Sequence, residues 1–375
     1  MRDEVHREDR AIGPIGRRLA RWRRRQNVAA SAFADQVGLS RQQLLALETG
    51  EDWADRRSLV AALAQAMRLD LTELTGQPYR PSDREHHVVR AVASHVRRHL
   101  IQVSLGQEGS AGTLGDLEAR TEAALTAEEA GDEYGLGLAL PGLLALADQT
   151  VAASVTGREP TARLRAQVYA VAAGLLRRVG YRDLVWMLLH QVGPERGVRA
   201  VLIEEMRLLL DLGFPDHALN RARRGEEGHG SNPELLLAAV AHAVAGRRDR
   251  AEQHIATAAA RAQNDRQMAA AASARVVIAL EVGAADEAAA HAGAVDFRTM
   301  VGAEHVDARV VAATATARQG RISQASAHLV AAHSLSPLRV RLSPVARELL
   351  SVLPARATAE DAATLRRIAA LAGLH

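Results

Sequence analysis

The apolar residues of this chain recur three and four positions apart along most of its length, which is the spacing of amphipathic α-helices. The most informative pattern spans residues 31–50, where it predicts two short helices joined by a tight turn. Ser31 is expected to cap the first helix, Gly38 to end it and Ser40 to cap the second. The apolar residues of this stretch that are expected to face a core are Phe33, Ala34, Val37, Leu44 and Leu47.

The second of these helices carries its polar residues at its N-terminal end and stops at Gly50. In the major groove of DNA a glutamine can pair bidentately with adenine, and an arginine with guanine. A short helix that begins with such residues is suited to reading that groove, although an ordinary pair of surface helices has the same pattern. The residues expected to read bases are Ser40, Arg41, Gln42, Gln43 and Leu45, of which Leu45 would meet a thymine methyl group.

A helix over residues 15–26 precedes this stretch, with Ile15, Leu19 and Trp22 facing inward. It carries six arginines, and no acidic residue lies between positions 11 and 34. Such a run is commonly only a solvated helix face, but beside a DNA-reading helix it is well placed to neutralise phosphates. The residues expected to contact phosphate are Arg21, Arg24, Arg25 and Ser31.

Helices over residues 56–67 and 71–75 complete a five-helix unit, which ends at the two prolines of residues 76–81. The Gly-Leu-Ser-Arg turn that begins at Gly38 and the Leu-Glu-Thr-Gly sequence that ends at Gly50 resemble the Xre family of helix-turn-helix regulators, related to phage repressors. The match covers about residues 15–76. Family members commonly begin the second helix with Thr-Gln, where this chain has Ala29-Ala30, so a side-chain contact typical of that glutamine is missing. Phosphate could still meet the backbone amides at that helix start.

Residues 86–105 predict a further helix, on which His95 and His99 lie four positions apart as a candidate metal pair. No third ligand follows at helical spacing, and a complete site needs three or four. We therefore expect a polar helix face there and no metal site. The glycine-rich residues 106–115 lack the Gly-Lys-Ser/Thr ending of a phosphate loop and do not follow a strand, which predicts a linker.

From about residue 114 onward the helices repeat. A glycine followed five positions later by a small or apolar residue recurs at steps of 33, 33, 37 and 37 residues. A period near 34, with glycine at the turn between paired helices, resembles tetratricopeptide repeats. We expect five or six helix pairs, including a degenerate early unit around residues 131–146, and a capping helix over residues 359–371. The pairs are Gly180 with Val185, Gly213 with Ala218, Gly246 with Ala251, Gly283 with Ala288, and Gly320 with Ala325.

The larger side chains of this region are expected to lie mostly in its core rather than in a pocket. They are Tyr169, Tyr181, Trp186, Met187, His190, Met206 and Phe214.

Adjacent acids diverge by about 100° on a helix, so the pairs Glu128-Glu129 and Glu204-Glu205 are expected on solvated faces rather than around one substrate. The sequence contains no catalytic motif and no strand pattern to hold one, so we expect neither an enzyme, nor catalytic residues, nor a cofactor.

Composition narrows this picture. The chain has 375 residues, of which 48% are hydrophobic and only 3% aromatic, and its wealth of alanine and leucine favours helices. All 47 basic residues are arginine and the formal net charge is only +3, so the basicity is local despite a pI of about 9.9. The absence of cysteine excludes disulfides and thiolate sites. Without a signal peptide or a long uncharged apolar run, the expected location is the cytoplasm, with no membrane partner.

The expected organisation is all-α: a flexible tail at 1–13, an Xre-like helix-turn-helix domain at 14–76, a linker at 77–85 and a tetratricopeptide-like α-solenoid at 86–375. The combination is similar to the peptide-sensing quorum regulators of Gram-positive bacteria and to repeat-bearing Xre regulators of actinobacteria. That resemblance implies a homodimeric transcription regulator of double-stranded DNA with a palindromic operator. It also implies a peptide or small-molecule effector, whose site the sequence leaves unknown. The alternative is an adaptor whose solenoid holds a protein partner while the head is vestigial.

Overall fold

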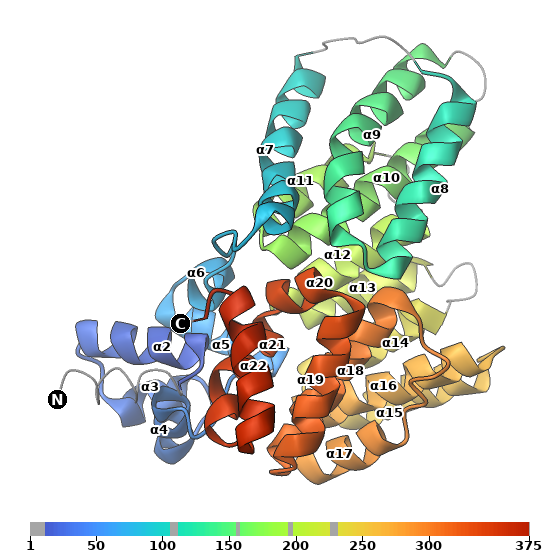
Figure 1. Cartoon of the computed structure of the whole chain (residues 1–375). Coiled ribbons are helices and arrows are strands. Elements are labelled where there is room, and N and C mark those ends of the chain that lie inside the picture. Colours follow the sequence, from blue (N-terminus) through green and yellow to red (C-terminus); the bar gives the residue numbers. More distant parts are fainter. Residues whose placement is uncertain (1–11, 106–111, 155–157, 194–197, 226–231, 375) are drawn as a thin grey trace.

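The computed structural model describes residues 12–105, 112–154, 158–193, 198–225 and 232–374. These residues form α-helices and one short 3-10 turn, without a β-strand among them (Figure 1). The predicted all-α fold, a small helical head followed by a helical-repeat solenoid, is confirmed. The predicted tail and the predicted loop at 106–115 lie mostly outside the described residues.

Five helices build the head, and they are α2 (Pro14–Arg25), α3 (Ala30–Gln36), α4 (Arg41–Thr49), α5 (Arg57–Met67) and α6 (Leu71–Thr75). Proline suits the first position of α2, because the N–H that it lacks would have no helical partner. Apolar side chains at helical spacing meet in one core, whereas Trp22, predicted inward, is only partly buried there. The fully buried members of this core include Leu19, Phe33, Leu44, Leu63 and Leu74.

The remaining helices form the solenoid, and the predicted capping helix at 359–371 coincides with the last of them. Consecutive helices pack as antiparallel pairs, and the pairs stack on one another (Figure 1). The solenoid helices are α7 (Arg84–Ser104), α8 (Leu114–Ala130), α9 (Glu133–Ala153), α10 (Arg158–Val179), α11 (Arg182–Gln191), α12 (Arg199–Asp211), α13 (Pro215–Gly225), α14 (Asn232–Val244), α15 (Arg248–Ala260), α16 (Asp265–Glu281), α17 (Ala285–Gly293), α18 (Gly302–Arg318), α19 (Ile322–Leu335), α20 (Pro337–Leu342), α21 (Pro344–Val352) and α22 (Ala359–Leu371).

A left-handed glycine makes each of the five turns at which the sequence predicts a repeat. Their φ angles are 108°, 79°, 73°, 77° and 71° for Gly180, Gly213, Gly246, Gly283 and Gly320, a region in which glycine avoids a steric cost. The residue five positions after each glycine is fully buried where the paired helices touch. A sixth turn of this kind at Gly131 is followed by the buried Leu136, which confirms the early unit.

The solenoid winds until its C-terminal helices return to its first pair. The Ser336 hydroxyl donates a hydrogen bond of 2.8 Å to the Gly131 carbonyl. The buried carboxylate of Glu133 is held by Arg339 at 2.7 Å and by Arg178 at 2.9 Å. Burial alone would raise the pKa of Glu133, but these two guanidinium groups lower it below its usual value. Ionic contacts thus join α9 and α10 to α20.

Helix α9 is long and apolar enough, by length and composition, to cross a membrane, and it is the one such helix among the described residues. Core helices of globular proteins pass the same test. Here α9 packs against α7, α8 and α10, and the buried Glu133 lies at its start. It is therefore a core helix of the solenoid.

Two glutamate side chains from the solenoid cap two helices of the head. Neither α2 nor α5 has a capping side chain of its own. Glu348 in α21 accepts a 2.6 Å hydrogen bond from the Ile15 amide at the start of α2. Glu281 in α16 accepts from the amides of Arg57 and Ser58, at 2.7 and 3.2 Å, and from the Ser58 hydroxyl at 2.8 Å. Since the first N–H groups of a helix need acceptors, these bonds fix the head on the solenoid.

The loop between α4 and α5 inserts into the C-terminal part of the solenoid. Trp53 is 4% exposed and belongs to the core formed by α18, α19, α21 and α22. Arg318 donates a hydrogen bond to the Trp53 carbonyl at 2.8 Å and forms ion pairs with Asp52 and Asp55. Its guanidinium group lies 4.6 Å from the centre of the Trp53 ring. Arg356 lies 5.2 Å from the same ring. The loop is thereby anchored by both apolar and ionic contacts.

The residues between head and solenoid, predicted as a linker, are packed rather than free. The Gln77 amide is 5% exposed and donates to the Arg178 carbonyl at 2.8 Å, while its oxygen accepts from Arg182 at 3.0 Å. The Tyr79 ring is buried under the Arg347 guanidinium, 3.7 Å from its centre, and burial raises the pKa of Tyr79 to about 12. The last head helix ends at Thr75, and the Gln77 and Tyr79 side chains beside the two prolines bind the head to the solenoid.

Candidate nucleic-acid interface

The N-terminal end of α4 presents polar side chains to solvent. Ser40 is the N-cap of the helix and takes part in a capping box with Gln43. Leu44 and Leu47 are buried in the head core, which turns the other face of the first turn outward. The exposed residues are therefore those predicted to read bases at this end, Ser40, Arg41, Gln42 and Gln43.

The two glutamines of this surface differ in their hydrogen bonds. The side-chain Oε1 atom of Gln43 accepts a hydrogen bond from the backbone amide of Ser40 at 2.9 Å. The backbone amide of Gln43 donates to the Ser40 hydroxyl at 3.1 Å. Gln42 makes no side-chain hydrogen bond to any of the described residues. Only Gln42 thus offers both amide atoms without breaking the cap. The Ser-x-x-Gln spacing signals a capping box and could have shown this difference in the sequence.

Leu45 is less exposed than the polar residues before it. It is partly buried, and its carbonyl accepts a 3.0 Å hydrogen bond from the Thr49 hydroxyl one turn later. A part of its side chain still faces solvent beside Gln42. The surface that Leu45 offers to a thymine methyl group is therefore small.

Five of the six arginines of α2 fall into two groups. Arg23 forms two 2.6 Å hydrogen bonds with the buried Glu48, and it ties α2 to α4. Arg18 donates to the carbonyls of Leu74 and Thr75, at 3.3 and 3.1 Å, where α6 ends. These two side chains hold the head together and are not available to a ligand. The three arginines predicted to contact phosphate are exposed and form no ion pair with the described residues, and they are Arg21, Arg24 and Arg25.

Ser31 does not cap α3, so that prediction is wrong. The helix starts earlier, and Ala29 is its N-cap with φ −62° and ψ 140°. Ser31 lies exposed in the first turn instead, and no side chain caps the helix. Since Ala29 has no hydroxyl, the first amides of α3 keep their donors for another acceptor. The position of Ser31 beside them remains suited to a phosphate contact.

The acidic pair Glu204-Glu205 is buried, which contradicts the solvated face predicted for it. Burial would raise the pKa of Glu204, but Arg177 and Arg207 lower it to about 2. Glu205 is paired instead with Arg221. The two carboxylates diverge as expected, and their ion pairs with Arg177 in α10 and Arg221 in α13 explain why they leave solvent. Sequence periodicity carried no sign of these partners.

The expectation that the larger side chains lie mostly in the core is right for Tyr169 and Met206, while Tyr181 is only partly buried. It is wrong for the other four, among which His190 is exposed. Trp186, Met187 and Phe214 are 42%, 50% and 51% exposed. The reason in α11 is geometric, because its inward face is already filled by Leu184, Val185, Leu188 and Leu189. The Trp186 ring lies against that of His190, tilted by 42°, with 4.0 Å between ring centres.

His99, one of the two histidines considered as metal ligands, is engaged within the solenoid. Its Nε2 atom lies 2.7 Å from Asp148, and the Tyr169 hydroxyl donates to the same carboxylate at 2.7 Å. His95 points into solvent on the same helix. In the described part of the chain, no three ligating side chains gather as a metal site would require.

In comparisons with known proteins, no family model, curated protein or solved structure matches this chain. Function is therefore inferred from the side chains themselves. They form an exposed polar helix start on a head that is bound firmly to the solenoid. It is flanked by three arginines that pair with none of the described residues and by a helix without a side-chain cap.

Proposed function

We propose that this chain is a sequence-specific DNA-binding transcription regulator that inserts the N-terminal end of α4 into the major groove. The observation that carries the proposal is the free, exposed pair Arg41 and Gln42 on a capped helix start. Arg41 has the geometry for guanine and Gln42 for adenine. Gln43, with its oxygen in the capping box, sets the start of the helix and adds less to base reading.

Phosphate contacts flank this helix in the proposal. Arg21, Arg24 and Arg25 supply positive charge from α2, and Ser31 with the uncapped amides of α3 supplies neutral donors. Sequence-independent affinity comes from these groups, whereas base preference comes from α4. Arg18 and Arg23 take no part, because their guanidinium groups are used inside the head.

The solenoid sets the position of the head. The capping bonds from Glu281 and Glu348 leave the head no free hinge, so a change in the solenoid moves the head with it. In a homodimer held through the solenoids, two heads would meet half-sites about 34 Å apart, one turn of DNA. An effector that alters the solenoid would then alter operator binding by changing this spacing.

Salt-dependent duplex binding tests the proposal. A duplex selected by the full chain from a random library is bound at several salt concentrations, with fluorescence anisotropy as the readout. Each lost phosphate contact reduces the magnitude of the slope of log affinity against log salt concentration by about 1. For the triple variant R21A/R24A/R25A we expect the magnitude of this slope to fall by about 3. Arg321→Ala, an exposed arginine on the solenoid, is the matched control and should change nothing. A chain that selects no duplex would be an adaptor with a vestigial head.

A further inference from the structure

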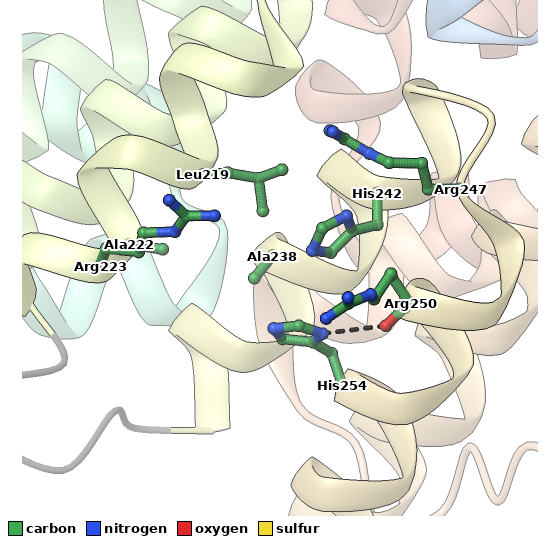
Figure 2. A pocket seen from close by; sticks show the side chains of 8 residues that line it. All are labelled: Leu219, Ala222, Arg223, Ala238, His242, Arg247, Arg250 and His254. Atoms are coloured by element: carbon green, nitrogen blue, oxygen red, sulfur yellow. Dashed lines mark hydrogen bonds between the residues drawn. The ribbon is translucent and has the colours of Figure 1, made fainter.

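A cavity of about 370 Å³ opens in the solenoid between α13 and α15, with α14 behind it (Figure 2). Its size is in the range of small-molecule sites. Basic and imidazole side chains line it together with a few small apolar ones, and no acidic residue is among them. The lining residues are Leu219, Ala222, Arg223, Ala238, His242, Arg247, Arg250 and His254.

Two of the three arginines are free. Arg223 in α13 and Arg250 in α15 are exposed and form no ion pair with the described residues. Arg247 is paired with Asp216 at 2.6 Å, and Asp216 lies outside the lining. Figure 2 shows Arg223 extending from one wall toward the space in front of the two histidine rings. The cavity thus holds at least two positive charges with no counter-ion among the described residues.

The histidines add hydrogen-bonding atoms to this positive surface. His254 Nδ1 lies 2.9 Å from the Arg250 carbonyl oxygen, which can only accept a hydrogen bond, so the proton is on Nδ1. The Nε2 atom of the ring is then available to a ligand. The His242 Nδ1 atom is buried and has no partner among the described residues. The ring centres lie 4.9 Å apart. Burial and the nearby His254, Arg247, Arg250 and Arg223 lower the pKa of His242 to about 4, so its ring is neutral at pH 7.

The combination favours one class of ligand. Several guanidinium groups around one recess match the charge and the three oxygens of a phosphoryl group better than a single carboxylate, which one arginine satisfies. A phosphoryl group fills only part of the space, and Leu219, Ala222 and Ala238 offer apolar surface to the rest of a ligand. A concave pocket suits a compact molecule, whereas the backbone of duplex DNA needs an extended, open surface.

We infer that this cavity is a binding site for a phosphorylated small molecule, with Arg223 and Arg250 as the primary phosphate ligands and the His242 and His254 rings beside them. The site lies in the solenoid, apart from the surface of α4. Its occupation does not depend on whether the head binds DNA.

Calorimetric titration of the full chain with inorganic pyrophosphate tests this site. The variant R223A/R250A removes only exposed side chains, so it keeps its fold, which circular dichroism verifies. We expect its dissociation constant for pyrophosphate to rise at least about tenfold, because two charge-assisted contacts are lost. Arg321→Ala and the head variant R21A/R24A/R25A should stay within about twofold of the unaltered chain. The imidazole resonances of His242 and His254 should shift on titration, while those of His95 should not.

Three results would overturn the inference. The first is no binding of pyrophosphate at millimolar concentration, and the second is equal weakening in R321A. In the third, citrate, a carboxylate of similar charge, binds the full chain more tightly than pyrophosphate does. Duplex DNA serves as a further arm: if R223A/R250A weakens duplex binding as much as pyrophosphate binding, the arginines belong to a nucleic-acid surface instead.

Discussion

Glu281 of the solenoid accepts hydrogen bonds from both the backbone amide and the hydroxyl of Ser58, at the first turn of head helix α5. The two residues are 223 positions apart in the sequence. The carboxylate also accepts from the preceding amide, so it acts as the N-cap that α5 lacks. A helix of the head therefore depends for its start on a side chain of the solenoid.

Replacement of Glu281 by alanine should destabilise the folded chain by about 1–2 kcal/mol, because the first amides of α5 lose their acceptor. The unfolding free energy from urea titration measures this. Ser58→Ala removes the hydroxyl and leaves both amide bonds, so its cost should be the smaller of the two. An equal cost for the two variants would show that the amide cap contributes nothing.

Glu348 should make stability fall as pH rises. Burial raises the pKa of this carboxyl to about 8, although the Ile15 amide and the nearby arginines oppose the shift. Its second oxygen, Oε2, is buried without a partner among the described residues, which disfavours the ionised form. Between the ordinary pKa of 4.5 and 8 the folded chain holds a proton that the unfolded chain has lost. Each pH unit in this window then removes at most about 1.4 kcal/mol of stability.

Glu348→Gln isolates this effect, since the amide keeps the acceptor for Ile15 and cannot ionise. Unfolding free energies of both chains are measured from pH 5 to pH 8. The difference between them should grow in favour of the variant as pH rises. Parallel curves would contradict the raised pKa of Glu348. Carboxylates such as Glu204, whose pKa is lowered to about 2, lose their stabilising effect only as pH falls and affect both chains equally.

Arg318→Ala should be among the most destabilising single changes on this chain. The arginine binds Asp52, Asp55 and the Trp53 carbonyl, and the Asp55 side chain is only 1% exposed. Its removal leaves a buried carboxylate without its partner, which costs about 3–5 kcal/mol. Arg321→Ala, three residues further on and exposed, should cost nothing measurable in the same urea titration. Similar midpoints for the two variants would show that the Trp53 loop is not held by this contact.

The turn glycines should differ in their tolerance of alanine. Both Gly213 and Gly246 have left-handed φ angles, 79° and 73°, so alanine at either costs about 1–2 kcal/mol of backbone strain. A Cβ at Gly213 would also lie 2.7 Å from the Ala61 Cβ of the head, whereas at Gly246 no atom lies within 4 Å. Gly213→Ala should thus lower the free energy of unfolding by about 1–3 kcal/mol more than Gly246→Ala does. Equal unfolding free energies would mean that the head does not press on this turn.

Local pattern predicted much of this fold from the sequence. The spacing of apolar residues located the helices of the head, and the glycines with their partners five positions later located the turns of the solenoid. Features that depend on contacts between distant residues could not be predicted. Glu348 lies 333 positions from the Ile15 amide that it caps, and no periodicity links them. The burial of Glu204-Glu205 has the same cause, since Arg177 and Arg221, with which they pair, lie on other helices.

The candidate DNA surface shows the same division. Exposure of Arg41, Gln42 and Gln43 followed from the apolar face of α4, and the capping box that occupies Gln43 was readable from its spacing. The division of the α2 arginines into structural and exposed side chains could not be read from the spacing. It depends on the hydrogen bond between Arg23 and Glu48, which lies 25 residues away on another helix. Ser31 was misplaced because a helix that starts at alanine gives no N-cap signal.

Base discrimination by Gln42 tests the central claim most directly. The affinity of the full chain for its selected duplex is compared with that for duplexes changed at one base pair, before and after Gln42→Ala. We predict that the variant loses about 1–3 kcal/mol of discrimination at one adenine position and keeps its salt dependence. Gln43→Ala should lose less, since its oxygen is used in the cap. Unchanged base preference in Gln42→Ala would contradict the assignment of α4 as the reading helix.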